Sequence, residues 1–275
     1  AKKAFIGGSE APCVGGCFGA IGGITLSEGV MSMCKNYSSN ISVAGMKMKS
    51  SNATATYIGG VAGFNSNEAK MCSNEGNILV EKNQHKSARV GGIVGTNVGT
   101  LGNCWNAGDI TVTSPLSTEG LCSTSSCNQY YTGGIAGYSA SATAAITNCS
   151  NTGKICLAEL RNTTAFSYAG GIAGEYAGTI TGCTNSGTVE STAATNVRLG
   201  GIGASIKAAV SSCTSNGPIN LTNGTSETFA YGATAGGIAG HTAADILYCD
   251  VDCALTLTNC ADSVCVGFVA GTTGA

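Results

Sequence analysis

A Gly-Gly pair followed by an aliphatic residue recurs seven times along this chain, and it constrains the fold more than any other feature. The first glycines of successive pairs are 30 to 42 residues apart, a spacing found in solenoids, propellers and repeat arrays. The pairs begin at Gly22, Gly59, Gly91, Gly133, Gly170, Gly200 and Gly236. The chain is therefore expected to fold by repeating one structural unit.

Each unit continues with a cysteine, in most copies an asparagine two residues later, and a glycine two residues after that, which predicts a tight turn. An alternating apolar pair follows, such as Ile78 and Val80 or Ile110 and Val112. Period-2 alternation of β-branched residues is typical of a strand with one buried face. Strands this short bury too little alone, so neighbouring units must stack in register.

The sequence therefore predicts an all-β protein: a single β-solenoid, or parallel β-helix, of about seven to eight rungs with essentially no helix. We expect one domain over residues 1–275, with a partial N-terminal rung or cap over 1–21, repeats over 22–265 and a partial C-terminal rung over 266–275. The repeated asparagines are expected to pass hydrogen bonds from rung to rung. The Gly-Gly pair is expected to mark a corner where only a missing Cβ lets rungs approach.

The pattern G-G-[IV]-x-G, followed by an apolar residue and then N-C-x-N-x-G-x-[IV]-x-V, resembles the GLUG-motif repeats of bacterial surface and secreted proteins. The copy from Gly91 to Val112 is closest to this pattern, and the resemblance covers most of the chain from about Gly22 onward. It implies a stacked β-solenoid in an adhesin-like or protease-associated extracellular region. It implies no catalytic residue, and insertions such as 113–132 lie outside it.

Fifteen cysteines divide into two groups. Seven occupy the repeated position, where we expect a ladder of buried, free and inert thiols, because rungs ~4.8 Å apart exceed the ~3.8 Å between Cβ atoms of a relaxed disulfide. These are Cys34, Cys72, Cys104, Cys149, Cys183, Cys213 and Cys249. The other eight are disulfide candidates in loops or near the ends, which favours an oxidising compartment. They are Cys13, Cys17, Cys122, Cys127, Cys156, Cys253, Cys260 and Cys265.

Composition disfavours several partners. The 13 basic and 15 acidic residues include no basic run, so no nucleic-acid partner is expected. No stretch reaches the roughly 20 apolar residues of a membrane-spanning helix, so no membrane insertion is expected. We expect an extracellular or cell-surface protein, secreted with its leader removed.

Asn-x-Ser/Thr sequons occur seven times, and five lie where a glycan is expected to fit if the protein is a glycoprotein. Asn148 and Asn220 are expected on outward strand faces, and the other three in loops. The five candidates are Asn52, Asn148, Asn162, Asn220 and Asn223.

No catalytic residue, metal site or cofactor is predicted. The chain has no C-x-x-C pair and only two histidines, so zinc is disfavoured. The acids are scattered, which disfavours the polysaccharide-degrading chemistry that some β-helix proteins carry. Asp245, Asp250 and Asp252 are the one concentration of carboxylates in a repeat; a calcium site and a solvated sheet edge are the two interpretations.

The repeat array has a partial unit at each end. Because open terminal rungs offer unpaired backbone groups, we expect copies to stack head to tail into a filament or surface layer. The residues expected at these self-assembly ends are Phe5, Ile6, Val266, Phe268 and Val269. Two other interpretations remain: loops around Cys13/Cys17 and Cys260/Cys265 that fold over the ends as caps, and a chain that is a fragment of a longer surface protein.

The sequence thus predicts a non-catalytic extracellular structural protein whose partner is itself. The alternative is an adhesin-type binding module that recognises carbohydrate or a host protein through its loops. The segment from Ser114 to Tyr131, with Tyr130 and Tyr131 expected to be exposed, is the main candidate for such a loop.

Overall fold

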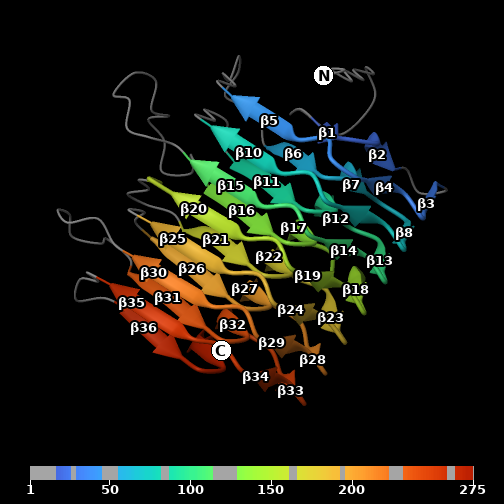
Figure 1. Ribbon diagram of the computed structural model, residues 1–275. Coiled ribbons are helices and arrows are strands. Elements are labelled where there is room, and N and C mark those ends of the chain that lie inside the picture. Colours follow the sequence, from blue (N-terminus) through green and yellow to red (C-terminus); the bar gives the residue numbers. More distant parts are fainter. Residues whose placement is uncertain are drawn as a thin grey trace.

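Short parallel strands follow one another around a repeating coil in this protein. The computed structural model describes residues 17–25, 29–44, 55–81, 87–113, 129–160, 166–192, 196–222, 232–258 and 264–274, apart from the side chains of 17, 18 and 23–25. Within these residues all helix and strand structure is β-strand. Each strand pairs in parallel with its counterparts in the neighbouring turns of the coil, and the result is the β-solenoid of Figure 1.

The coil has five sheets, here named A to E in the order in which the chain enters them. Sheet A contains β1 (Cys17–Gly19), β6 (Thr56–Gly59), β11 (Ser87–Gly91), β16 (Gln129–Gly133), β21 (Ser167–Gly170), β26 (Val197–Gly200), β31 (Ala233–Gly236) and β36 (Val264–Gly267). Sheet B contains β2 (Gly22–Thr25), β7 (Ala62–Asn65), β12 (Val94–Asn97), β17 (Ala136–Ser139), β22 (Ala173–Tyr176), β27 (Gly203–Ile206), β32 (Ala239–Thr242) and β37 (Ala270–Thr273).

The other three sheets have seven strands each. Sheet C contains β3 (Val30–Ser32), β8 (Glu68–Lys70), β13 (Thr100–Gly102), β18 (Ala145–Thr147), β23 (Thr179–Thr181), β28 (Val210–Ser211) and β33 (Ile246–Leu247). Sheet D contains β4 (Lys35–Asn36), β9 (Ser73–Asn74), β14 (Trp105–Asn106), β19 (Ser150–Asn151), β24 (Thr184–Asn185), β29 (Thr214–Ser215) and β34 (Asp250–Val251). Sheet E contains β5 (Ile41–Ala44), β10 (Ile78–Glu81), β15 (Ile110–Thr113), β20 (Ile155–Ala158), β25 (Val189–Thr192), β30 (Ile219–Thr222) and β35 (Leu255–Thr258).

A rung is one passage through the sheets from A to E, so the described strands make seven complete rungs and an eighth formed by β36 and β37 alone. The prediction of an all-β solenoid of seven to eight rungs is confirmed, and the described residues contain no helix. The connections from sheet E to the next strand of sheet A differ most in length. The sequence insertions therefore fall between rungs.

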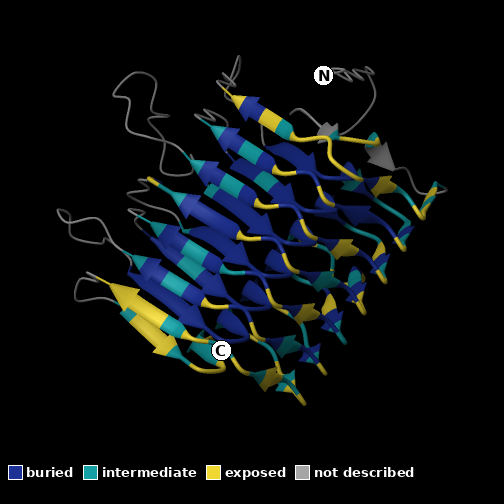
Figure 2. Ribbon diagram, in the orientation of Figure 1, coloured by how far each residue is buried: buried dark blue, intermediate teal, exposed yellow. Residues whose placement is uncertain are grey.

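The inner rungs are largely buried (Figure 2), and their apolar side chains form two columns that run along the solenoid. One lies between sheets B and C and includes Ile93 and Leu101. The other lies between sheets A and E and includes Val90, Ile110 and Val112. The alternating apolar pairs of the sequence supply sheet E of the second column, as period-2 alternation requires.

Six of the Gly-Gly pairs, from Gly59-Gly60 to Gly236-Gly237, form the waist between the two columns. The equivalence predicted for Gly22-Gly23 is wrong, because Gly22 is the register partner of Ala62 in sheet B and Gly19 is the register partner of Gly59. A Cβ added to Gly92 would lie 2.1 Å from the carbonyl oxygen of Gly134 in the next rung and 2.3 Å from Cγ of Asn106 across the same rung. A Cβ added to Gly91 would lie 2.0 Å from the carbonyl oxygen of Val94. All three distances are far shorter than van der Waals contact. Neither Gly91 nor Gly92 can therefore carry a side chain where the chain turns from sheet A to sheet B.

The repeated asparagines lie opposite these glycines and form a buried hydrogen-bonded ladder. Nδ2 of Asn74 donates to Oδ1 of Asn106 at 2.8 Å, and Nδ2 of Asn106 donates to Oδ1 of Asn151 at 2.8 Å. In the four ladder asparagines from Asn74 to Asn185, the second hydrogen of the carboxamide goes to the carbonyl oxygen of the glycine two residues later, as from Asn106 to Gly108 at 2.8 Å. In Asn36 it goes to the carbonyl oxygen of Ser39. The expected rung-to-rung hydrogen bonds are therefore present, and they fill the waist with satisfied polar groups.

The residue before each ladder cysteine has a left-handed backbone, with φ between 52° and 64°. Asparagine and glycine adopt this conformation most easily, whereas other side chains are strained in it. The residues in this column are Met33, Met71, Asn103, Asn148, Gly182, Ser212 and Tyr248.

Candidate functional site

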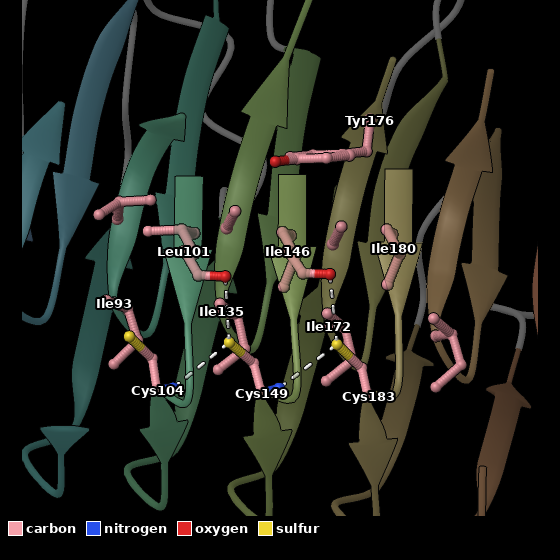
Figure 3. Close-up of a cluster of buried hydrophobic side chains, with 14 of the residues drawn as sticks. Ile93, Leu101, Cys104, Ile135, Ile146, Cys149, Ile172, Tyr176, Ile180 and Cys183 are labelled. Atoms are coloured by element: carbon pink, nitrogen blue, oxygen red, sulfur yellow. Dashed lines mark hydrogen bonds between the residues drawn. The ribbon is translucent and has the colours of Figure 1, made fainter. Parts of the chain in front are cut away.

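The seven cysteines of the repeated position form one column at the turn between sheets C and D. Figure 3 shows three of them, Cys104, Cys149 and Cys183. The backbone N–H of Cys104 donates to Sγ of Cys149 at 3.4 Å, and that of Cys149 donates to Sγ of Cys183 at 3.4 Å. All seven are free; Cys34 and Cys249 in the terminal rungs are half-buried and the other five are buried. Hydrogen bonding with the neighbouring Cys104 thiol and burial both raise the pKa of Cys149, so this thiol is protonated and unreactive near neutral pH.

Three of the disulfide candidates, Cys156, Cys253 and Cys265, are also free thiols, which corrects the sequence-based expectation for them. The strand register gives the reason for Cys156, which lies between Thr111 and Glu190 of the neighbouring rungs. The other candidates lie outside the described residues or, for Cys17, have an undescribed side chain: Cys13, Cys17, Cys122, Cys127 and Cys260.

Burial raises the pKa of the Cys156 thiol to about 12 from an ordinary value of 9.0. In the unfolded chain this thiol therefore ionises at a lower pH than in the folded protein. The contribution of the Cys156 thiol to the free energy of unfolding is complete below pH 9 and is lost as the pH rises toward about 12. We expect the free energy of unfolding, measured by urea titration, to fall over this range and to fall less in Cys156→Ala. Replacing the exposed Cys265 by alanine is the control and leaves the pH profile unchanged. An unchanged profile in Cys156→Ala would assign the loss to other groups such as Tyr168, whose pKa burial raises to about 12.

Two of the glycosylation candidates lie in the described residues. Asn220 is half-buried on the outward face of β30, as expected. Asn148 is exposed, but it occupies the left-handed turn between β18 and β19 instead of a strand face, because it precedes a ladder cysteine. Asn52, Asn162 and Asn223 lie outside the described residues.

A column of aromatic and arginine side chains follows the outward face of sheets A and B, and we name it the aromatic–arginine strip. Its five members in sheet A stand two residues before the Gly-Gly pairs that begin at Gly59, Gly91, Gly133, Gly170 and Gly200, and they are in register from rung to rung. Their neighbours come from sheet B and from the residue before β21. The strip consists of Tyr57, Phe64, Arg89, Tyr131, Tyr138, Phe166, Tyr168 and Arg198.

Cation–π and aromatic contacts connect the strip across five rungs. The guanidinium carbon of Arg89 lies 3.8 Å from the centroid of the Tyr138 ring. The Tyr131 and Tyr168 rings are stacked with centroids 4.9 Å apart. In the next rung, the guanidinium carbon of Arg198 lies 5.8 Å from the centroid of the Tyr168 ring. Contacts of this kind stabilise by about 0.5–2 kcal/mol each.

The strip corrects one sequence-based expectation. Tyr130 and Tyr131 were expected in an exposed loop, but both belong to β16 and are buried, Tyr130 in the apolar column between sheets A and E and Tyr131 in the strip. Strand alternation sends the two side chains to opposite faces. Aligning the residue two before each Gly-Gly pair is the signal that reveals the strip in the sequence.

The C-terminal edge strands β35 and β36 are largely exposed (Figure 2), and apolar residues are among the exposed ones. Val266, Phe268 and Val269 are 41%, 73% and 48% exposed, and Phe5 and Ile6 lie outside the described residues. Leu255 in β35 is only half-buried, whereas its register partner Ile219 one rung inward is fully buried. The apolar column between sheets A and E is therefore open at this edge.

The N-terminal edge strands have the same character. Met31 in β3 and Ile41 in β5 are half-buried, whereas their register partners Ala69 and Ile78 are buried. Among the described residues, both apolar columns thus end in side chains that one further rung would cover.

Within the described residues, no group of three or more histidine, cysteine, aspartate or glutamate side chains is arranged to hold a metal ion. Asp245, Asp250 and Asp252 are exposed at the C-terminal edge. Among the residues that the structure describes, no helix is long and apolar enough to cross a membrane.

This protein is a β-solenoid. It is defined as one by its parallel strands in register, its waist of glycine and asparagine and its two apolar columns. The family model of the GLUG motif matches residues 128–155, which include β16 to β19 and the start of β20 in the fourth rung. This one matched motif and the β-solenoid fold are consistent with a GLUG-repeat β-solenoid protein, so the resemblance drawn from the sequence is confirmed. No curated protein and no solved structure matches the chain.

Proposed function

We propose that this β-solenoid is a non-catalytic structural protein of an extracellular surface and that it assembles end to end into a filament or layer. The observation that carries the proposal is that, among the described residues, the apolar side chains of both columns are buried in the inner rungs and partly exposed in the first and last strands. A GLUG β-solenoid is consistent with a non-enzymatic surface protein.

The edge strands have the two properties that self-association needs. Their outer backbone groups face no further described strand, and unpaired strand edges are templates for pairing with another chain. Fully burying an apolar side chain contributes about 1.5–3 kcal/mol, and several are exposed at the C-terminal edge alone. Because the two edges differ, their contact is head to tail and does not close on itself.

Electron microscopy of the purified protein at micromolar concentration tests the proposal. We expect filaments or sheets with an axial repeat of about 35–45 Å, which is seven or eight rungs of ~4.8 Å. Short isolated rods at every concentration would contradict end-to-end assembly.

Leu257→Lys sharpens this test. Leu257 aligns with the buried Leu221 of the preceding rung, so lysine there places a charge at the open end of an apolar column. We expect sedimentation to show monomers under conditions in which the wild type assembles. Thr256→Lys, on the outward face of the same strand, is the matched control and assembles as the wild type does.

The adhesin alternative stays a prediction. Most of the proposed binding segment, residues 114–128, lies outside the described residues, and Tyr131 packs inside the aromatic–arginine strip. Binding of a monomeric form to a glycan panel is the result that would favour it.

A further inference from the structure

The two arginines of the aromatic–arginine strip are held in the same way, by aromatic rings. The guanidinium carbon of Arg89 lies 3.8 Å from the centroid of the Tyr138 ring and 5.2 Å from that of Tyr57. The guanidinium carbon of Arg198 lies 4.4 Å from the centroid of the Phe166 ring. A cation–π contact is an attraction of the charge to the ring, so it does not satisfy the five N–H donors of a guanidinium.

These donors have no acceptor among the residues that the structure describes. Nε of Arg89 and Nε of Arg198 are both buried without a hydrogen-bond partner, and neither guanidinium forms an ion pair with a described residue. Such unsatisfied buried donors are rare in folded proteins. Both arginines are only half-buried as whole residues, so part of each side chain reaches the surface of the strip.

The charge around the strip is predominantly positive. Glu175 borders the strip as the register partner of Tyr138, but its Oε1 already accepts a hydrogen bond from Nζ of Lys207 at 2.6 Å. Lys207 therefore neutralises Glu175, and the two arginines keep their charge. Burial lowers the pKa of His241, and the charge of Arg198 lowers it further, as expected where positive charge predominates.

The strip is narrow and straight, which suits an extended partner. Its five members in sheet A are register partners in successive rungs. With ~4.8 Å between neighbouring strands, these residues span about 19 Å, and Arg89 and Arg198 stand about 14 Å apart along the axis. A globular protein partner needs a broader face, since a typical interface covers about 800 Å² on each side.

The strip combines aromatic surface with a few placed donors, which is the usual composition of a ligand site. Phe64, Tyr138 and Phe166 are half-buried, so their rings offer apolar surface to the C–H groups of a sugar ring. A guanidinium binds the two oxygens of a carboxylate with two parallel N–H···O bonds. Sugar rings that carry carboxylates supply both kinds of contact.

We propose that the aromatic–arginine strip binds a linear acidic polysaccharide along the axis of the solenoid, with sugar carboxylates at Arg89 and Arg198. The sugar rings near these points contact Tyr138 and Phe166. This site is separate from the long insertion of the adhesin alternative, and it does not depend on end-to-end assembly.

Calorimetric titration of the protein with oligogalacturonate at low ionic strength tests the proposal. We expect binding that weakens as salt is added. Arg89→Gln and Arg198→Gln are each expected to raise the dissociation constant about tenfold, and the double variant is expected to show no measurable binding. Lys70→Gln, which removes a charge from the outward face of sheet C, is the control and binds as the wild type does.

Arg89→Lys tests whether the guanidinium geometry is used. Lysine keeps the positive charge and the attraction to the rings but cannot form two parallel hydrogen bonds to a carboxylate. We therefore expect it to bind more weakly than the wild type. This variant also keeps the test informative if Arg89→Gln fails to fold, which the unfolding midpoint of each variant shows.

Three results would overturn the proposal. The first is a wild type that does not bind oligogalacturonate, or that binds neutral dextran equally well. The second is a folded double variant that binds as tightly as the wild type, which would place the ligand elsewhere on the chain. The third is binding of inorganic polyphosphate with none of oligogalacturonate, which would make the ligand a phosphate polymer. Monomers in the electron microscope would contradict end-to-end assembly and leave this proposal standing.

Discussion

Replacing Asn106 by alanine is expected to lower the free energy of unfolding by about 3 kcal/mol or more. The carboxamide is fully buried and is hydrogen-bonded to Asn74, Asn151 and Gly108. Its removal leaves polar partners in the waist without hydrogen bonds, and each such group costs about 1–3 kcal/mol. Urea or thermal unfolding followed by circular dichroism measures the loss.

Asn216→Ala is the control for this experiment. Asn216 is an exposed residue at the corresponding turn of the sixth rung, so its replacement is expected to change stability by less than about 0.5 kcal/mol. If Asn106→Ala is as mild as Asn216→Ala, the ladder does not stabilise the waist and the apolar columns alone hold the rungs together.

Gly92→Ala is expected to be still more disruptive. The added Cβ would meet the backbone oxygen of Gly134 and the Asn106 carboxamide at once, and neither atom belongs to a flexible side-chain end. The rungs must separate locally, which breaks both the ladder and the strand pairing. We expect a loss above about 4 kcal/mol, observed as insoluble protein or as a soluble fraction without the β-sheet circular dichroism signal.

Gly102→Ala is the matched control for Gly92→Ala. Gly102 lies in β13 of the same rung, and an added Cβ would have no heavy atom within 4 Å. We expect this variant to fold with an unfolding midpoint close to that of the wild type. A Gly92→Ala protein that behaves like Gly102→Ala would show that the close approach of the rungs at the waist can relax at little cost.

The repeat carries enough information to predict the rungs, the asparagine ladder and the column of free thiols. Those features depend on residues at one position of successive units, and stacking in register places such residues side by side. The sequence does not show which positions meet across a rung. That Gly92 faces Asn106, and so divides the interior into two apolar columns, depends on the angles of all the intervening turns.

Other features escaped prediction for similar reasons. Met71 occupies a left-handed turn that its residue type disfavours, so only its place before a ladder cysteine indicates that conformation. Tyr131 follows a long insertion and was assigned to a loop, although it stands two residues before a Gly-Gly pair as Arg89 does.

The parallel pairing of all five sheets has a mechanical consequence. Interstrand hydrogen bonds run along the axis of the solenoid, so tension applied along this axis loads five hydrogen-bonded strips together in every inner rung. Two neighbouring rungs separate only when all five strips give way, so the described rungs resist stretching as one unit.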